Sequence, residues 1–224
     1  MRATWDAAAA SERLDDYVGD PATAHAELES LFGRLGDDPR GGVCAEVGCG
    51  PGRMTIDLAE RFDRVLAVDV SPAMLEAARQ RVVAPNVELR LVSGDLLDSV
   101  EDGVADVLVC YLVLQHLPRR AVVLAYLREF ARVLAPGGRA FLQIPVLGPG
   151  IRPRLWRLAR GVAVPLGRMS HDVAQQPSYR GYRLTEDELA EGLASARLRV
   201  TARDESAESP YRYAREIFLR LEQR

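Results

Sequence analysis

The sequence predicts an α/β protein whose parallel sheet is covered by helices on both faces. From residue 43 onward, short apolar runs alternate with segments of helical periodicity, a pattern typical of a doubly wound parallel sheet. A glycine-rich loop, Gly48–Gly52, follows the first apolar run and opens the first helical segment. The chain of 224 residues is 48% hydrophobic and 27% charged, a balance typical of a globular domain with its own core.

Residues 1–40 predict two helices ahead of the sheet. Apolar residues recur at helical spacing before Gly19 and again over residues 28–35. The turn residues Gly19-Asp20-Pro21 separate the two segments, and a glycine-rich stretch over residues 36–42 ends the second.

Strands and helices then alternate, and a shorter series closes the chain. The expected strands are Val43–Val47, Val65–Val68, Val87–Val92, Ala105–Cys110, Arg139–Ile144, Leu198–Ala202 and Ile217–Leu221. The expected helices are Met54–Arg61, Pro72–Val82, Ala121–Leu134 and Glu186–Ala196, the last with Thr185 as its N-cap. Residues 146–183 interrupt this rhythm and predict an insertion.

The loop Glu46-Val47-Gly48-Cys49-Gly50-Pro51-Gly52-Arg53 carries the strongest functional signal. Its glycines let the backbone approach a ligand at the positive end of a helix. A dinucleotide site has a third glycine where this chain has Arg53. The carboxylate of Glu46 would repel a pyrophosphate and attract an ammonium group. The loop therefore favours a nucleoside with a cationic tail, and an ordinary glycine-rich turn is the alternative.

Two further acids follow the next two strands. Asp69 lies about 20 residues beyond the glycine loop, where an acid can bond both hydroxyls of a ribose. Asp95, within Gly94-Asp95-Leu96, can accept from the exocyclic amine of an adenine. Such strand ends are where open α/β sheets bind ligands. The alternatives are that Asp69 only caps the helix begun by Ser71-Pro72, and that Asp95 is a solvated turn residue.

Taken with two later motifs, these residues resemble the class I S-adenosylmethionine-dependent methyltransferase family. The match runs from Gly42 to Pro145, with a weaker match from Arg183 onward. Its motifs are EVGCGPG at 46–52, VDVSPAML at 68–75, GDL at 94–96, LQHLP at 114–118 and LREFARVLAPGG at 127–138.

The resemblance implies a Rossmann-like sheet of seven strands, mostly parallel, whose last strand is antiparallel. It also implies one methyltransferase domain over residues 1–224, in four parts. These are an N-terminal helical lid over 1–40, a cofactor-binding core over 41–145, a substrate-lid insertion over 146–183, and a C-terminal helix with strands over 184–224.

The resemblance further implies S-adenosyl-L-methionine as cofactor and S-adenosyl-L-homocysteine as product. Glu46 and the backbone of Gly48, Cys49 and Gly50 would hold the methionine end, and Arg53 would reach its carboxylate. Asp69 would take the ribose hydroxyls. The adenine would lie beside Val70 and Met74, near Gly94, Asp95 and Leu96, and the methionine moiety would meet Cys110, Tyr111 and Gln115.

The catalytic group is less well defined, because methyl transfer needs alignment above all. A general base is required only when the acceptor keeps its proton near neutral pH. His116, after the fourth strand, is the candidate base, and the alternative is that it packs against the next helix. His171 with Asp172 is a second candidate, and His25 ranks below both.

The cysteines and histidines predict neither a disulfide framework nor a metal site. Cys44, Cys49 and Cys110 lack CxxC spacing, and the three histidines are far apart. Cys110 follows Val109 and not a proline, so it is interpreted as a small neutral residue and not a nucleophile. A reducing cytoplasm is the expected compartment, with no secretory leader and no stable membrane insertion.

The expected function is methyl transfer to a small-molecule acceptor, with O-methylation ahead of N-methylation. Specialised metabolism is the expected setting, the acceptor is expected to be small and acidic or lipid-like, and monomer and homodimer stay open. The net charge of −3 argues against nucleic acid as partner. The alternatives are a cofactor-binding regulatory or partner-dependent methyltransferase subunit and an NAD(P)-dependent oxidoreductase.

Every basic residue is arginine, and arginines cluster in the insertion over residues 151–162. A helix there would place Leu155, Leu158, Ala159 and Val162 on one face and Arg154, Arg157 and Arg160 on another. One interpretation packs the apolar face on the core. The others are an acceptor bearing carboxylate or phosphate, or an anionic membrane surface. Five aromatic residues would line an apolar pocket or pack the lid: Trp5, Tyr17, Trp156, Tyr179 and Tyr182.

Overall fold

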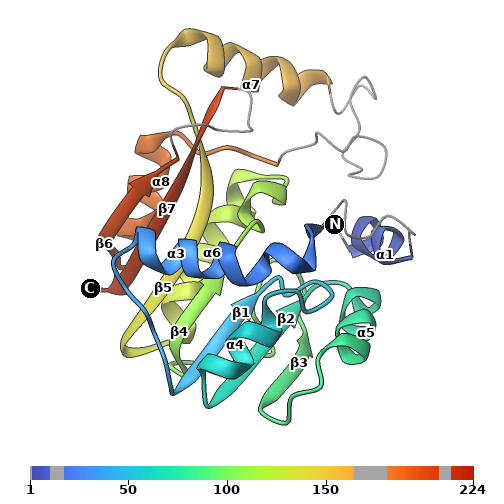
Figure 1. The fold of residues 1–224 in the computed structure, drawn as a ribbon. Helices are drawn as coiled ribbons and strands as arrows, with labels where there is room; N and C mark the ends of the chain where they lie inside the picture. Colours follow the sequence, from blue (N-terminus) through green and yellow to red (C-terminus); the bar gives the residue numbers. More distant parts are fainter. Residues whose placement is uncertain (1, 11–17, 164–180, 207–212) are drawn as a thin grey trace.

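The computed structural model describes residues 2–10, 18–163, 181–206 and 213–224, arranged as a sheet between two layers of helices (Figure 1). The helices are α1 (Arg2–Ala9), η1 (Pro21–Thr23), α3 (Ala24–Arg34), α4 (Thr55–Arg61), α5 (Pro72–Arg81), η2 (Leu114–His116), α6 (Arg120–Val133), α7 (Ile151–Ala163) and α8 (Glu186–Ser195). The strands are β1 (Val43–Val47), β2 (Arg64–Asp69), β3 (Val87–Leu91), β4 (Ala105–Cys110), β5 (Leu134–Leu147), β6 (Leu198–Glu205) and β7 (Ala214–Gln223).

The seven strands form one sheet in the order β3-β2-β1-β4-β5-β7-β6. Strands β1 to β5 pair in parallel, and β7 is antiparallel to both of its neighbours. This confirms the predicted fold class, including the antiparallel last strand. The carboxyl ends of β1, β2, β3 and β4 therefore lie at one edge of the sheet, where the loops that follow them meet.

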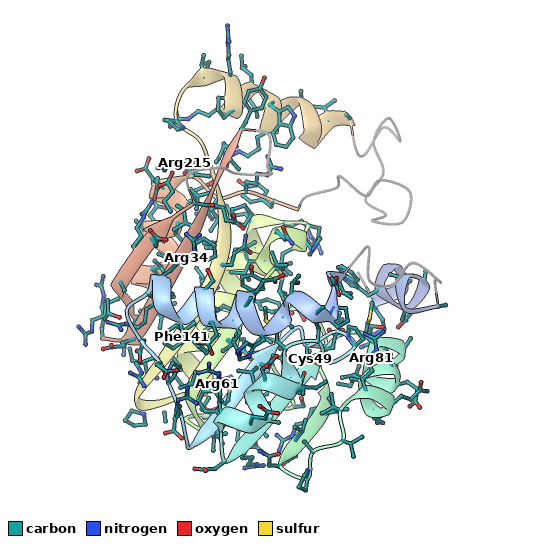
Figure 2. All side chains as sticks on the ribbon, in the orientation of Figure 1. Arg34, Cys49, Arg61, Arg81, Phe141 and Arg215 are labelled. Carbon is teal, nitrogen blue, oxygen red and sulfur yellow. The ribbon has the colours of Figure 1, made fainter. Side chains whose placement is uncertain are left out.

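Alternating side chains on the strands build a separate core on each face of the sheet. On one face, Cys44, Ala67 and Val109 pack with residues of α3, α4 and α5. On the other face, Ala45, Val68 and Leu108 pack with α6 and α8. Phe141 of β5 meets Phe32 of α3 edge to face, with ring centroids 4.9 Å apart (Figure 2). The double covering explains why the central strands are mostly apolar.

The C-terminal half departs from the predicted bounds. Strand β5 continues past Pro145 to Leu147, because that segment pairs with β7 from Arg139↔Glu222 to Leu147↔Ala214. The predicted strand ended at Ile144. Pro145 cannot donate a ladder hydrogen bond, but this pairing accommodates it. The insertion contains α7, as the arginine segment predicted. Within the described ranges no helix is both long and apolar enough to span a bilayer.

Helix α8 begins with a capping box. The Glu188 backbone N–H donates to Thr185 Oγ1, and the Thr185 backbone N–H donates to Glu188 Oε2 at 2.8 Å. The Glu188 carboxylate also accepts from Arg157 and from the Tyr182 hydroxyl, so this helix start connects α8 to α7. The box thus anchors the C-terminal half of the fold.

We expect Thr185→Ala to lower the free energy of unfolding by about 1 kcal/mol, because an N-cap acceptor is lost. Urea unfolding of the whole chain measures it. Ser195→Ala, at the exposed far end of the same helix, is the control and should stay within about 0.5 kcal/mol of wild type. Equal stabilities for Thr185→Ala and wild type would show that the cap is energetically silent.

Candidate active site

The loops after β1 and β2 are joined by backbone hydrogen bonds at the carboxyl edge of the sheet. The N–H groups of Gly48 and Cys49 both donate to Val68 O, at 2.8 and 3.0 Å. The Gly50 N–H donates to Asp69 Oδ2 at 2.9 Å. The glycine loop is therefore shaped by the strand that carries the predicted ribose acid.

Two glycines are required where loops press on each other. Gly48 has a φ of +74°, and a Cβ there would lie 2.3 Å from Val113 Cγ2. Gly94 has a φ of +103°, and its Cβ would lie 2.9 Å from Val70 Cγ2. Side chains are excluded at both positions, so the β1 loop packs on the β4 loop and the β3 loop on the β2 loop.

Gly50 differs from these two glycines. Among the described residues, a Cβ at Gly50 would meet Val18 alone, at 3.9 Å, although its φ of +55° is also left-handed. The described side chains therefore do not crowd its backbone. Figure 2 labels its neighbour Cys49 at this end of β1. Of the loop's glycines, Gly50 best fits the predicted close approach of a ligand.

Glu46 is a buried carboxyl, only 5% exposed, at the end of β1. Burial raises the pKa of Glu46 to about 7, and the neighbouring Asp69 charge adds to this. The Thr55 hydroxyl, which donates to Glu46 Oε2 at 2.6 Å, and the Arg53 guanidinium oppose the rise in pKa. A cation beside Glu46 would favour its ionised form.

Both oxygens of the Asp69 carboxylate accept backbone hydrogen bonds. Oδ1 accepts from the Ser71 N–H at 2.8 Å, and Oδ2 accepts from Gly50. The N-cap of α5 is Ser71, whose hydroxyl accepts from the Met74 N–H. Asp69 is therefore not the helix cap, and its remaining lone pairs can accept from a ligand. Burial raises the pKa of Asp69.

Arg53 lies in the same loop but is drawn toward α3. Its Nη2 donates to Glu27 Oε2 at 2.9 Å, with the Arg53 side chain 7% exposed. The ion pair fixes the guanidinium over the loop and leaves other N–H groups for a ligand. Sequence patterns singled out Arg53 but not Glu27, because the pair joins residues on different elements.

The loop after β4 holds the remaining predicted residues. Cys110 is buried, and burial raises the pKa of its thiol, in accord with a neutral, unreactive side chain. Gln115 Nε2 donates to Leu112 O at 3.0 Å and lies 3.1 Å from His116 Nε2. The intervening Leu112 has a φ of +58°, so the chain turns sharply just after Tyr111.

Helix α1 bridges two of these loops. Arg2 Nε donates to Val70 O at 2.9 Å, and the Ser71 hydroxyl donates to Asp6 Oδ1 at 2.5 Å. The Trp5 ring meets the His116 ring edge to face, with centroids 5.0 Å apart. The helix predicted before Gly19 rested on apolar residues at 14–18, of which 14–17 fall outside the described residues. The docking of α1 could not be predicted, because it joins residues far apart in the chain.

Three other predicted residues are solvent-exposed. Asp95 and Leu96 are exposed, with Asp95 Oδ1 accepting from the Ser93 hydroxyl at 3.3 Å. His25 pairs with Asp57 at 2.8 Å on the surface between α3 and α4. The candidates His171, Asp172, Tyr17 and Tyr179 fall outside the described residues.

The aromatic residues of the insertion pack α7 onto the C-terminal region. The Trp156 ring lies 6.1 Å from Tyr213 and 4.7 Å from the Arg183 guanidinium. Arg157 stacks over Tyr182 at 5.2 Å and donates to Glu188 Oε2 at 2.7 Å. These contacts favour lid packing over a pocket-lining role for Trp156 and Tyr182.

The interpretation that packs the apolar face of α7 on the core is wrong. Leu155, Leu158 and Val162 are 54%, 66% and 62% exposed. The face toward the protein carries Pro153, Trp156 and Arg157 instead. Arg157 turns this face inward because it binds the Glu188 carboxylate and stacks on the Tyr182 ring.

The donor set fits a nucleoside with a cationic tail better than it fits a metal. The buried carboxylates of Glu46 and Asp69 lie with the glycine loop at one edge of the sheet. No group of three histidine, cysteine or acidic side chains suited to a metal occurs within the described residues. Metal independence itself stays a prediction.

Comparisons with known proteins agree with this geometry. Residues 45–142 match the family model described as a methyltransferase domain. The chain is 30% identical over 141 residues to a ubiquinone biosynthesis O-methyltransferase of Xanthomonas axonopodis, covering 60% of this chain and 57% of that protein. It is 37% identical over 123 residues to a trans-aconitate 2-methyltransferase of Methylobacterium radiotolerans, covering 54% and 44%.

The chain thus spans about half the length of these curated relatives. Among solved structures, a SAM-dependent methyltransferase from Leishmania major superposes with a TM-score of 0.70 at 14% identity. The superposition covers 98% of this chain and 80% of that one. At this identity the likeness concerns the fold alone.

We expect Glu46→Gln to change how stability depends on pH. The pKa of Glu46 is about 7 in the folded chain against an ordinary value of 4.5. Between these values the folded state binds the extra proton, so the contribution of Glu46 to stability falls as pH rises. The free energy of unfolding of wild type minus that of Glu46→Gln should fall by on the order of 3 kcal/mol across this window.

Urea unfolding at unit steps from about pH 5 to about pH 8 measures this difference. Glu191→Gln, at an exposed glutamate, is the control, and its difference from wild type should stay constant with pH. A pH-independent difference for Glu46→Gln would contradict a raised pKa.

Proposed function

Because the chain belongs to the class I S-adenosylmethionine-dependent methyltransferase family, we propose that it transfers a methyl group from S-adenosylmethionine to an oxygen atom of a small molecule. The observation that carries this proposal is the convergence of Glu46, the Gly48–Gly50 loop and Asp69 at the carboxyl edge of the sheet.

In this proposal each end of the cofactor meets a different group. Glu46 and the Gly48–Gly50 backbone hold the methionine end, with Arg53 toward its carboxylate. Asp69 takes the ribose, because its oxygens keep lone pairs beyond those used by Gly50 and Ser71. Val70 and Met74, followed by the Gly94–Leu96 turn, border the adenine.

When bound, the cofactor supplies a methyl group already activated on a sulfonium. The chain's residues therefore orient the reactants and exclude water. Helix α1 covers the loops after β2 and β4, and Trp5 borders His116. In the proposal His116, whose Nε2 lies 3.1 Å from Gln115 Nε2, is the residue that receives the acceptor's proton.

The two curated relatives support an oxygen acceptor. One is named for O-methylation in ubiquinone biosynthesis, and the other for methylation of trans-aconitate. We therefore place hydroxyl- and carboxylate-bearing metabolites first, in specialised metabolism. An N-methylated amine is the second choice.

The two other functions have less support. Arg53 occupies the position where a dinucleotide-binding loop has its third glycine. The carboxylate of the buried Glu46 would repel the pyrophosphate of a nicotinamide dinucleotide. A regulatory subunit that does no chemistry would not need Glu46, Asp69 and His116 at one site. A methyltransferase that depends on a partner would still need them.

Calorimetry and a methyl-transfer assay test the proposal together. We expect the chain to bind S-adenosylmethionine and S-adenosylhomocysteine but not NADH or NADPH. Tritiated cofactor with separate pools of phenols, carboxylic acids and amines then identifies the acceptor atom, and turnover is expected to persist in EDTA. Absence of binding to both methionine nucleosides would overturn the proposal.

We expect Asp69→Asn to weaken S-adenosylhomocysteine binding by about 1–3 kcal/mol, because charge-assisted hydrogen bonds to the ribose are lost. Asp187→Asn, at an exposed aspartate of α8, is the matched control. Calorimetry with a thermal melt of each variant separates lost contacts from lost fold. Unchanged affinity in a folded Asp69→Asn would restrict Asp69 to shaping the loop.

We expect His116→Gln to lower kcat by about 100-fold or more while leaving cofactor affinity near wild type, since a general base is removed. A small effect at all pH values would mean that His116 only packs against Trp5.

A further inference from the structure

The outer face of α7 carries an apolar stripe with an arginine on each side. Ile151, Leu155, Leu158 and Val162 are 66%, 54%, 66% and 62% exposed. At about 100° per residue these four positions fall within a narrow sector of the helix. Arg152 and Arg154 are exposed and lie on opposite flanks of that sector. We call these six residues the α7 stripe.

The segment around the α7 stripe is basic. No acidic residue occurs from Gly148 through His171, in a chain whose net charge is −3. Neither Arg152 nor Arg154 pairs with a carboxylate in the part of the chain that the structure describes. By contrast Arg157, on the inner face, is neutralised by Glu188. The outer face thus combines uncompensated positive charge with aliphatic side chains.

Helix α7 also projects from the body of the molecule. Figure 1 shows it at one end, beyond the tips of β5 and β7. It is attached through Pro153, Trp156 and Arg157, so its contacts with the protein do not use the stripe. A projecting helix can meet an extended flat surface without a clash from the sheet.

We propose that the α7 stripe docks the protein reversibly on an anionic phospholipid membrane. The aliphatic side chains would enter the boundary of headgroups and acyl chains. The flanking arginines would meet lipid phosphates, an arrangement typical of interfacial amphipathic helices. The helix lies on the surface and does not span it.

Charge favours this occupant over a second copy of the chain. A two-fold contact through the stripe brings Arg152 and Arg154 of both copies into one interface, with no acid on this face to offset them. An anionic surface supplies the missing charge.

Helix α7 follows a strand that ends on the same side of the sheet as the candidate active site. Strand β5 runs parallel to β4, so its carboxyl end, which leads to α7, lies at the same edge of the sheet as the glycine loop. Docking through the stripe would therefore turn this side of the molecule toward the membrane, although docking itself does not depend on methyl transfer.

Vesicle co-sedimentation of the full chain tests the proposal without any acceptor. Vesicles of phosphatidylcholine alone are compared with vesicles containing phosphatidylglycerol at a quarter of the lipid. We expect binding to the anionic vesicles, weakened at high salt, and little binding to the neutral ones.

Leu155→Glu/Leu158→Glu should reduce anionic-vesicle binding by at least about tenfold. Val83→Glu, at a valine 93% exposed on another surface, is the matched control. Arg152→Gln/Arg154→Gln should reduce binding by about fivefold or more for each charge removed. Arg119→Gln/Arg128→Gln, at exposed arginines of the α6 region, is its control. Thermal melts and S-adenosylhomocysteine binding verify that each variant is folded.

Three results would overturn the proposal. The first is absence of binding to anionic vesicles. The second is equal binding by wild type and the stripe variants. The third is a dimer, detected by sedimentation velocity, that Leu155→Glu/Leu158→Glu dissociates, because the stripe would then join two copies of the chain. Failure of vesicle binding with intact cofactor binding leaves the proposed methyl transfer standing.

Discussion

The Asp69 carboxylate is the contact on which the site depends. One of its oxygens binds the Gly50 N–H and the other binds the Ser71 N–H, so a single side chain fixes both the glycine loop and the entry to α5. Val68, one residue earlier, holds Gly48 and Cys49 through its carbonyl. The end of β2 therefore sets the shape of the loop after β1, and a ligand meets a surface that is already organised.

The same arrangement explains why Glu46 can be kept buried. Ionising Glu46 beside Asp69 is costly, and burial adds to the cost, yet Thr55 and Arg53 offset part of it. The negative charge of Glu46 is thus only partly stabilised by its neighbours. A cationic tail completes the balance, which ties the electrostatics of the loop to the proposed cofactor.

Local pattern was sufficient for most of the fold. The bounds of β1 and β4 match the prediction at both ends, because apolar runs between turn residues are short-range signals. The glycine loop and Asp69 were also found, since each follows a recognisable strand. The exposed stripe of α7 was not predicted, because periodicity shows that a helix has two faces and not which of them turns inward. The inward face of α7 is set by the contact of Arg157 with Glu188, which lies on another helix. The docking of α1 likewise depends on partners far along the chain.

Helix α1 is joined to the body through Arg2, Trp5 and Asp6, whose partners lie on the loop after β2, at the start of α5 and on η2. It contributes one residue, Ala8, to the buried apolar set, while both main cores lie elsewhere. Releasing α1 would therefore be a local opening that leaves the sheet and its helices folded. If α1 forms the N-terminal part of the proposed lid, substitutions in it would change access to the proposed site at little expense to the stability of the domain.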